Sequence, residues 1–187
     1  DMRSVVVVCS QNNWTRHMVR ELKRKGVVPI LVGVAVDQFG DSVSGVMLAR
    51  RALIEKIMDY FIGCNRRKIA LVGVNKNASN DNLKAEVFLR NCKALGLNSG
   101  KDDIYWIDSD ITGSIKQFIQ NASMYDGAIC SNDYVAVALL KMAREKGICV
   151  PKDVYVAGIG DTFIGRYAEP TLTTTSSNEF FEDRKST

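Results

Sequence analysis

Side chains that could carry out chemistry are sparse in this sequence. It contains a single histidine, His17, and a Ser-His or Cys-His nucleophile would have to use it. No cysteine or acidic pair stands near His17 at a spacing that suits a metal ion. Gly158 and Gly160 lack the third glycine of a dinucleotide fingerprint, and no Walker phosphate loop is present. These features predict a protein that is not an enzyme and holds no metal or cofactor.

The cysteines and the apolar runs indicate the compartment. The five cysteines are widely separated, odd in number and without a C-x-x-C pair, which is typical of reduced core residues in a cytosolic protein. No apolar run approaches the roughly 20 residues that cross a bilayer, and residues 1–4 do not resemble a signal peptide. We therefore expect a cytoplasmic protein.

The charge balance is mildly basic. Lysine and arginine exceed aspartate and glutamate by 25 to 21, which is a formal net charge of +4. The densest basic run, residues 20–25, is short, whereas a nucleic-acid-binding domain usually carries a basic stripe or a recognised reading motif. We therefore expect no direct DNA contact from this chain.

Polar residues follow two predicted strands at the point where each strand ends. The apolar segment 127–130 is followed by Ser131, Asn132 and Asp133, which are residue types that cap a starting helix. That helix ends at Gly147, and a second apolar strand, 154–157, leads into residues 158–161. A right-handed crossover brings both strand ends to one edge of a parallel sheet, where open α/β sheets bind ligands. The sequence thus places a candidate binding site at this edge.

The alternation of strands and helices continues along the whole chain. Four consecutive valines at 5–8 are typical of a strand that is covered on both faces. The remaining pattern predicts further strands at 28–34, 43–48, 68–74, 104–107 and 171–175, and helices at 14–25, 50–62, 82–95 and 112–121. Such alternation predicts an α/β fold built from two doubly wound parallel sheets, with a hinge at residues 65–67.

Four short sequence words occur in a fixed order. They are Ser131-Asn132-Asp133, Val150-Pro151-Lys152-Asp153-Val154, Gly158-x-x-Asp161 and Pro170-Thr171-Leu172-Thr173-Thr174. In order and spacing they resemble the effector domain of the lactose-repressor and galactose-repressor (LacI/GalR) family of bacterial transcription regulators. Residues 66–73 resemble the family's entry strand into its second lobe. The resemblance spans nearly the whole chain and is most specific after Asn65.

The resemblance implies a division into lobes. It implies a periplasmic-binding-protein-like fold of type I, with a first lobe at residues 1–65 and a second lobe at 66–175. Residues 176–187 would return to the first lobe and begin a helix there. The family would add a βαβ unit and a DNA-reading helix-turn-helix upstream, so we expect a domain that is truncated at both ends, with an incomplete first lobe.

The resemblance also implies effector contacts. Lys84 stands where most relatives carry a clamping arginine; the alternative is a solvated lysine in a first helical turn. Asn132 matches a family ligand contact, although it could also simply cap its helix. Gly160 replaces the acidic residue of sugar-binding relatives, so only Asp161 keeps a carboxylate there. Asp108 stands where relatives often have an aromatic platform. The pocket is therefore not expected to be a standard sugar pocket.

Together these features predict a ligand-sensing and dimerisation domain of a repressor-type regulator. Its partners would be a small polar or anionic effector, such as a sugar or a sugar derivative, and a second copy of the chain. DNA would be bound only through the helix-turn-helix that the chain lacks. An alternative with the same fold is the solute-binding protein of an ABC-type sugar transporter, which would need a secretion signal.

Overall fold

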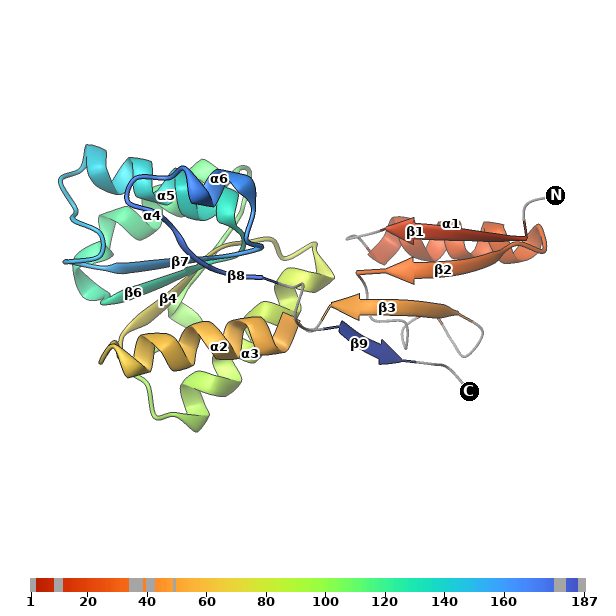
Figure 1. Cartoon of the computed structure of the whole chain (residues 1–187), viewed down its shortest axis with the longest axis horizontal. Helices are drawn as coiled ribbons and strands as arrows, with labels where there is room; N and C mark the ends of the chain where they lie inside the picture. Colours follow the sequence, from red (N-terminus) through yellow and green to blue (C-terminus); the bar gives the residue numbers. More distant parts are fainter. Residues whose placement is uncertain are drawn as a thin grey trace.

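The computed structural model describes residues 3–8, 12–33, 39, 43–48, 50–176 and 181–184 of the 187-residue chain. It contains two separate β-sheets flanked by helices, and these lie side by side along the long axis of the molecule (Figure 1). The first has strand order β1-β2-β3-β9 and the second β5-β4-β6-β7-β8. All neighbouring strands are parallel except β3 and β9. The prediction of an α/β fold with two parallel-sheet lobes is confirmed.

The first sheet is small and carries one helix. Its elements are β1 (Ser4–Val8), α1 (Asn12–Arg24), β2 (Val28–Val32), β3 (Ser44–Leu48) and β9 (Phe181–Arg184). Its buried apolar core consists of Val7, Val19, Leu31 and Val43. Val6 and Val8 point away from α1 and are 62% and 78% exposed, so the expectation that β1 is covered on both faces is wrong for the described residues. Among the described helices, only α1 makes extensive contacts with this sheet, and it makes them with β2.

The second sheet is covered on both faces. Its elements are α2 (Arg50–Gly63), β4 (Ile69–Val74), α3 (Ser79–Ala94), β5 (Ile104–Trp106), α4 (Ile111–Gln120), β6 (Gly127–Cys130), α5 (Asp133–Glu145), β7 (Tyr155–Ile159), α6 (Phe163–Arg166) and β8 (Thr173–Thr175). Every residue of β4 and β6 is buried. Core residues of α4 and α5 pack on one face, and those of α2 and α3 pack on the other.

Helix α2 lies with the second sheet. Its predicted stripe of Leu53, Ile57 and Phe61 is buried, and it joins the cluster that includes Ile69 of β4. Contacts of α2 with α3, β7 and β8 complete this packing. The expected lobe boundary at residue 65 leaves α2 in the first lobe, whereas its apolar face packs on the second sheet. The stripe alone could not reveal this, because it identifies a buried face but not the surface that buries it.

The return segment forms a strand instead of the expected helix. Residues 181–184 pair antiparallel with β3, and Gly45 lies opposite Arg184. Strand pairing satisfies backbone groups along the otherwise open edge of β3, which accounts for the extended conformation. The residues between 176 and 181 lie outside the described part of the chain.

Candidate functional site

The candidate site lies at the carboxyl edge of the second sheet. In Figure 1 the strands of the two parallel sheets run toward each other, so that their carboxyl ends meet across the middle of the molecule. The loops that follow β4, β6 and β7 and the end of β8 gather at this edge. They carry most of the polar residues that the sequence identifies, and their arrangement can be followed contact by contact.

A buried carboxylate organises this edge. Asp133 is fully buried, and its Oδ2 accepts hydrogen bonds from the backbone N–H of Thr162 at 2.6 Å and from Thr162 Oγ1 at 2.8 Å. Its Oδ1 accepts from Thr174 Oγ1 at 2.6 Å. These bonds satisfy the carboxylate, which would otherwise be costly to bury. Asp133 thereby ties the start of α5 to the loop after β7 and to β8.

The close approach of Asp133 explains why residue 158 is a glycine. A Cβ atom on Gly158 would overlap the Asp133 carboxylate, so no larger residue fits there without movement. Sequence reasoning identified Asp133 only as a residue that starts a helix. Its partners Thr162 and Thr174 lie 29 and 41 residues further along the chain, and no local pattern reports such contacts.

Asn132 caps helix α5. Its Oδ1 accepts a hydrogen bond from the backbone N–H of Val135 at 3.0 Å, and its Nδ2 donates to Ser131 Oγ at 3.4 Å. The capping interpretation is therefore confirmed. Asn132 is only partly buried at the sheet edge.

Lys84 is a buried connection between two segments of the edge. It is 6% exposed, and its Nζ lies 2.7 Å from Asp81 Oδ1 and donates to the backbone oxygen of Ser131 at 2.7 Å. Asp81 in turn accepts from the backbone N–H of Asn75 at 3.0 Å. Lys84 is thus not a solvated lysine. It joins the start of α3 to the end of β6, directly beside Asn132.

Gly160 and Asp161 form the loop after β7. Both have positive φ, 138° and 48° respectively. The value at position 160 lies outside the left-handed helical region and suits essentially only glycine, whereas aspartate tolerates the left-handed value at position 161. The backbone N–H of Asp161 donates to Thr174 Oγ1 at 3.2 Å, and its carboxylate lies 3.4 Å from Arg166. The structure therefore brings Asp161 into the network around Asp133, with its carboxylate partly open to solvent.

Asp108 is separate from this network. It follows β5, the edge strand of the sheet, and it is exposed. Of the five residues identified from the sequence, the contacts connect Lys84, Asn132 and Asp161 through residues 131–133 and Thr174. Gly160 adjoins them through the chain.

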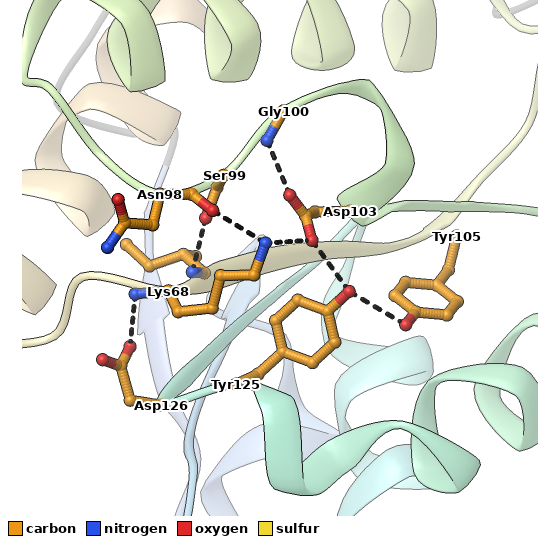
Figure 2. Close-up of polar contacts among 9 residues, drawn as sticks. Lys68, Asn98, Ser99, Gly100, Asp103, Tyr105, Tyr125 and Asp126 are labelled. Atoms are coloured by element: carbon orange, nitrogen blue, oxygen red, sulfur yellow. Dashed lines mark hydrogen bonds and ion pairs between the residues drawn. The ribbon is translucent and has the colours of Figure 1, made fainter.

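A second polar cluster lies at the opposite, amino edge of the same sheet (Figure 2). Lys68 Nζ lies 2.6 Å from Asp103 Oδ1, which also accepts from Tyr125 Oη at 2.9 Å, and Tyr105 Oη donates to Tyr125 Oη at 3.0 Å. Burial raises the pKa of Tyr125 far above its usual value, and the hydrogen bonds with Tyr105 and Asp103 raise it further. The cluster fastens the starts of β4, β5 and β6, and it contains no nucleophile paired with a base.

Asp126 belongs to the same edge and holds the predicted hinge in place. Its carboxylate accepts hydrogen bonds from the backbone N–H groups of Arg67 at 2.8 Å and Lys68 at 3.0 Å. Residues 66 and 67 lead from α2, which packs on the second sheet, into β4, which is a strand of that sheet. The connection at residues 65–67 therefore runs within one packed unit and does not join the two sheets.

The described residues offer little for metal or thiol chemistry. Among them, no group of three or more His, Cys, Asp or Glu side chains could hold a metal ion. Cys92 and Cys130 are buried free thiols, and burial raises the pKa of Cys92 to about 11. Cys149 is exposed, so it is not the core residue that was expected. No described helix is long and apolar enough to span a bilayer.

Comparison with known proteins identifies the family. Residues 58–178 match the family described as periplasmic binding protein-like domain, and the chain belongs to that family. The transcriptional repressor PurR of Aliivibrio salmonicida is 24% identical over 180 residues, which are 91% of this chain and 51% of the relative. The chain spans about half the length of the curated relatives that it matches most extensively. The resemblance to LacI-family regulators is thereby confirmed, and the chain covers part of the effector domain.

Solved structures agree on the fold. A complex of the transcriptional regulator CelR with cellobiose has a TM-score of 0.81 at 19% identity and covers 93% of this chain and 54% of its own. A LacI-family regulator from Lactobacillus casei with bound sucrose has a TM-score of 0.68 at 21% identity. The match covers 86% of this chain and 68% of the regulator. These relatives are named as transcription regulators and not as enzymes, in agreement with the expected lack of catalytic activity.

Proposed function

We propose that this chain is the ligand-sensing and dimerisation domain of a cytoplasmic, repressor-type transcription regulator, and that a small effector binds between the facing edges of its two sheets. The observation that carries the proposal is the carboxyl edge organised by Asp133. There three loops present capping and acidic groups on a rigid scaffold. Ligands of open α/β sheets bind at this edge. The sugars named in the structures of CelR and the Lactobacillus casei regulator support a sugar or a related polar metabolite as the effector.

The residues at the edge have different roles in this proposal. Asn132 and Asp161 contact the effector, because both residues are only partly buried at the edge. Lys84 supports the edge through Asp81 and Ser131. Its positive charge lies beneath the edge and attracts an anionic effector. Gly160 leaves space where a side chain would be strained, and Asp108 borders the site on the side of β5.

Effector binding would be coupled to DNA binding through the arrangement of the two sheets. A ligand that contacts both edges favours the arrangement in which those edges lie closer. The helix-turn-helix lies outside this chain and reads the operator, so the change must pass through the dimer. The affinities for effector and for operator then alter each other by the same factor.

The homodimer that we propose uses the outer face of α5 and α6. Phe163 and Tyr167 are each 74% exposed, with ring centroids 4.6 Å apart, which is unusual for aromatic residues on a monomer. Beside them is a groove of about 320 Å³, lined by Val137, Leu140, Lys141, Arg144, Tyr167, Ala168 and Glu169. Its basic and acidic rims suit a two-fold interface, in which Lys141 or Arg144 of one copy faces Glu169 of the other.

Ligand screening tests the effector site. Thermal unfolding should be measured with sugars, sugar phosphates, nucleobases and carboxylates, since a ligand at 100 times its Kd stabilises the folded state by about 2.7 kcal/mol. For any ligand found, Asn132→Ser should weaken binding at least tenfold, because serine keeps the helix cap but removes the amide. Asn121→Ala, at the exposed end of α4, is the matched control and should leave binding unchanged. Wild-type affinity in Asn132→Ser would refute the site.

A further inference from the structure

The net positive charge of the molecule is concentrated on one helix. Between residues 12 and 25 the chain carries five of its 25 lysines and arginines but one of its 21 acidic residues. The other residues therefore hold 20 of each sign and are neutral together. The whole formal charge of +4 thus lies on α1 and the residue that follows it. Lys23 and Arg24 lie in the last turn, where positive charge favours a helix, but Arg16 and Arg20 lie earlier, where like charges one turn apart repel.

The arginines of α1 form one exposed row. Arg16, Arg20 and Arg24 are spaced four residues apart and are all exposed, while Thr15 and Val19 on the opposite face are buried toward the sheet. Arg20 Nε donates to the backbone oxygen of Arg16 at 3.4 Å. Arg24 lies 3.0 Å from Glu21, yet its side chain stays 73% exposed. The row is therefore available to a partner in solution.

We infer that this row, the basic face of α1, binds the phosphate backbone of a nucleic-acid duplex without reading its sequence. The three arginines span about 12 Å along the helix, a length over which one strand of B-DNA presents about three to four phosphates. The phosphates of a duplex are regularly spaced and all negative, so they match an evenly spaced row of positive arginines. A protein surface of mixed charge matches such a row less well. Guanidinium groups also bind phosphate oxygens through paired hydrogen bonds.

The expectation that the basic run is too short for DNA contact took residues 20–25 as a linear segment. In the structure, α1 adds Arg16 to this run and directs the three arginines to one side, which is the basis of the inference. The row also lies apart from the proposed dimer face. In Figure 1, α1 covers the first sheet, whereas α5 and α6 belong to the second. This contact goes beyond the proposed function, in which operator recognition belongs to a helix-turn-helix outside the chain.

The salt dependence of DNA binding tests the inference. Anisotropy of a labelled 20-base-pair duplex should be measured with this chain from 25 to 200 mM NaCl. Three neutralised phosphates predict a slope of about −2.7 in log K against log salt. The triple variant Arg16→Ala, Arg20→Ala, Arg24→Ala should bind more than tenfold more weakly at the lowest salt, with the slope reduced to near zero. Alanine favours helix, so α1 should persist, and circular dichroism checks this.

A charge-matched variant separates the row from net charge. Lys93→Ala, Lys101→Ala, Lys116→Ala removes the same charge from exposed positions of the second lobe, and it should bind the duplex as the wild type does. Equal weakening in both triple variants would overturn the inference, as would equally tight binding of polyglutamate or anionic vesicles. Absence of duplex binding at 25 mM NaCl would also overturn it. None of these results bears on effector binding, which is measured independently.

Discussion

The two sheets of this protein differ in how completely they are covered. The second sheet has helices on both faces, and all residues of its central strands β4 and β6 are buried. The first sheet has α1 on one face, while Val6, Val8 and Val28 on the other are between 52% and 78% exposed. Parallel sheets are normally buried on both faces. The second sheet therefore has a complete core of its own on both faces, whereas the first sheet is stabilised by a smaller core on one face.

This difference also separates structural from functional residues. At the second sheet, buried polar groups such as Asp133 and Lys84 are satisfied by bonds that cross between elements. They hold the candidate edge on rigid elements, which is what a precise binding site requires. At the first sheet, the arginines of α1 lie on the surface, and the phosphate contact that we infer for them does not need such a fixed edge.

The largest effect should come from Phe61, which tests whether α2 belongs to the second core. Its ring is fully buried and meets Tyr155 edge to face with centroids 6.0 Å apart. Phe61→Ala should lower the free energy of unfolding by about 3–5 kcal/mol through lost burial and a cavity. Its neighbour Tyr60 is 49% exposed, so Tyr60→Ala should cost about 0.5 kcal/mol. Urea unfolding measures both, and equal losses would contradict the packing of α2 described here.

Alkaline pH should weaken the second core through Cys92. Burial, followed by the nearby Asp103 charge, raises its pKa from 9.0 to about 11, so the folded state favours the neutral thiol. The stabilisation is complete below pH 9 and is lost as pH rises through 11, by about 2 kcal/mol. Cys92→Ala should flatten this part of the pH profile, measured by denaturant unfolding at each pH. Cys149→Ala, at an exposed thiol, should leave the profile as it is.

A smaller effect should follow from loosening the binding edge. Thr174→Val removes a hydroxyl that donates to Asp133 Oδ1 at 2.6 Å, and the buried carboxylate then lacks one of its partners. The expected loss is about 1–3 kcal/mol. Thr173 lies one position earlier on β8 and is exposed, so Thr173→Val is a matched control with an expected change near zero. If both variants unfold alike, Asp133 does not organise the edge.

The second sheet could be predicted from the sequence more fully than the first. Its buried strands, such as Ile69–Val74 and Gly127–Cys130, are continuous apolar runs bounded by polar residues, and such runs specify an interior strand without further information. The helix cap at Asn132 follows from residue type alone. The valines of β1 form an equally apolar run. Whether both faces of that strand are covered depends on elements elsewhere, and the run itself cannot report them.

The candidate site could be located from the sequence but not assembled. Strand ends identified Asn132 and Asp161, because polar residues after apolar runs mark the edge of a sheet. The sequence did not reveal that Lys84 reaches Ser131, 47 residues away, or that Asp133 is the buried centre of the network. Those contacts arise only when crossovers bring distant loops together, so residue spacing carries no trace of them.

The smallest effect should come from the uncovered face of the first sheet, where it separates two explanations of the exposed valines. Val6 and Val8 already contact water, so the double variant Val6→Thr, Val8→Thr should change the free energy of unfolding by no more than about 0.5 kcal/mol. Val7, on the opposite side of the same strand, is 5% exposed, and Val7→Ala should cost about 2 kcal/mol from lost burial and the cavity left behind. Urea unfolding of the wild type, the double variant and Val7→Ala gives the ratio of the two losses in stability. A double variant as destabilised as Val7→Ala would mean that the outer face is covered in solution, and the contrast between the two sheets would then disappear.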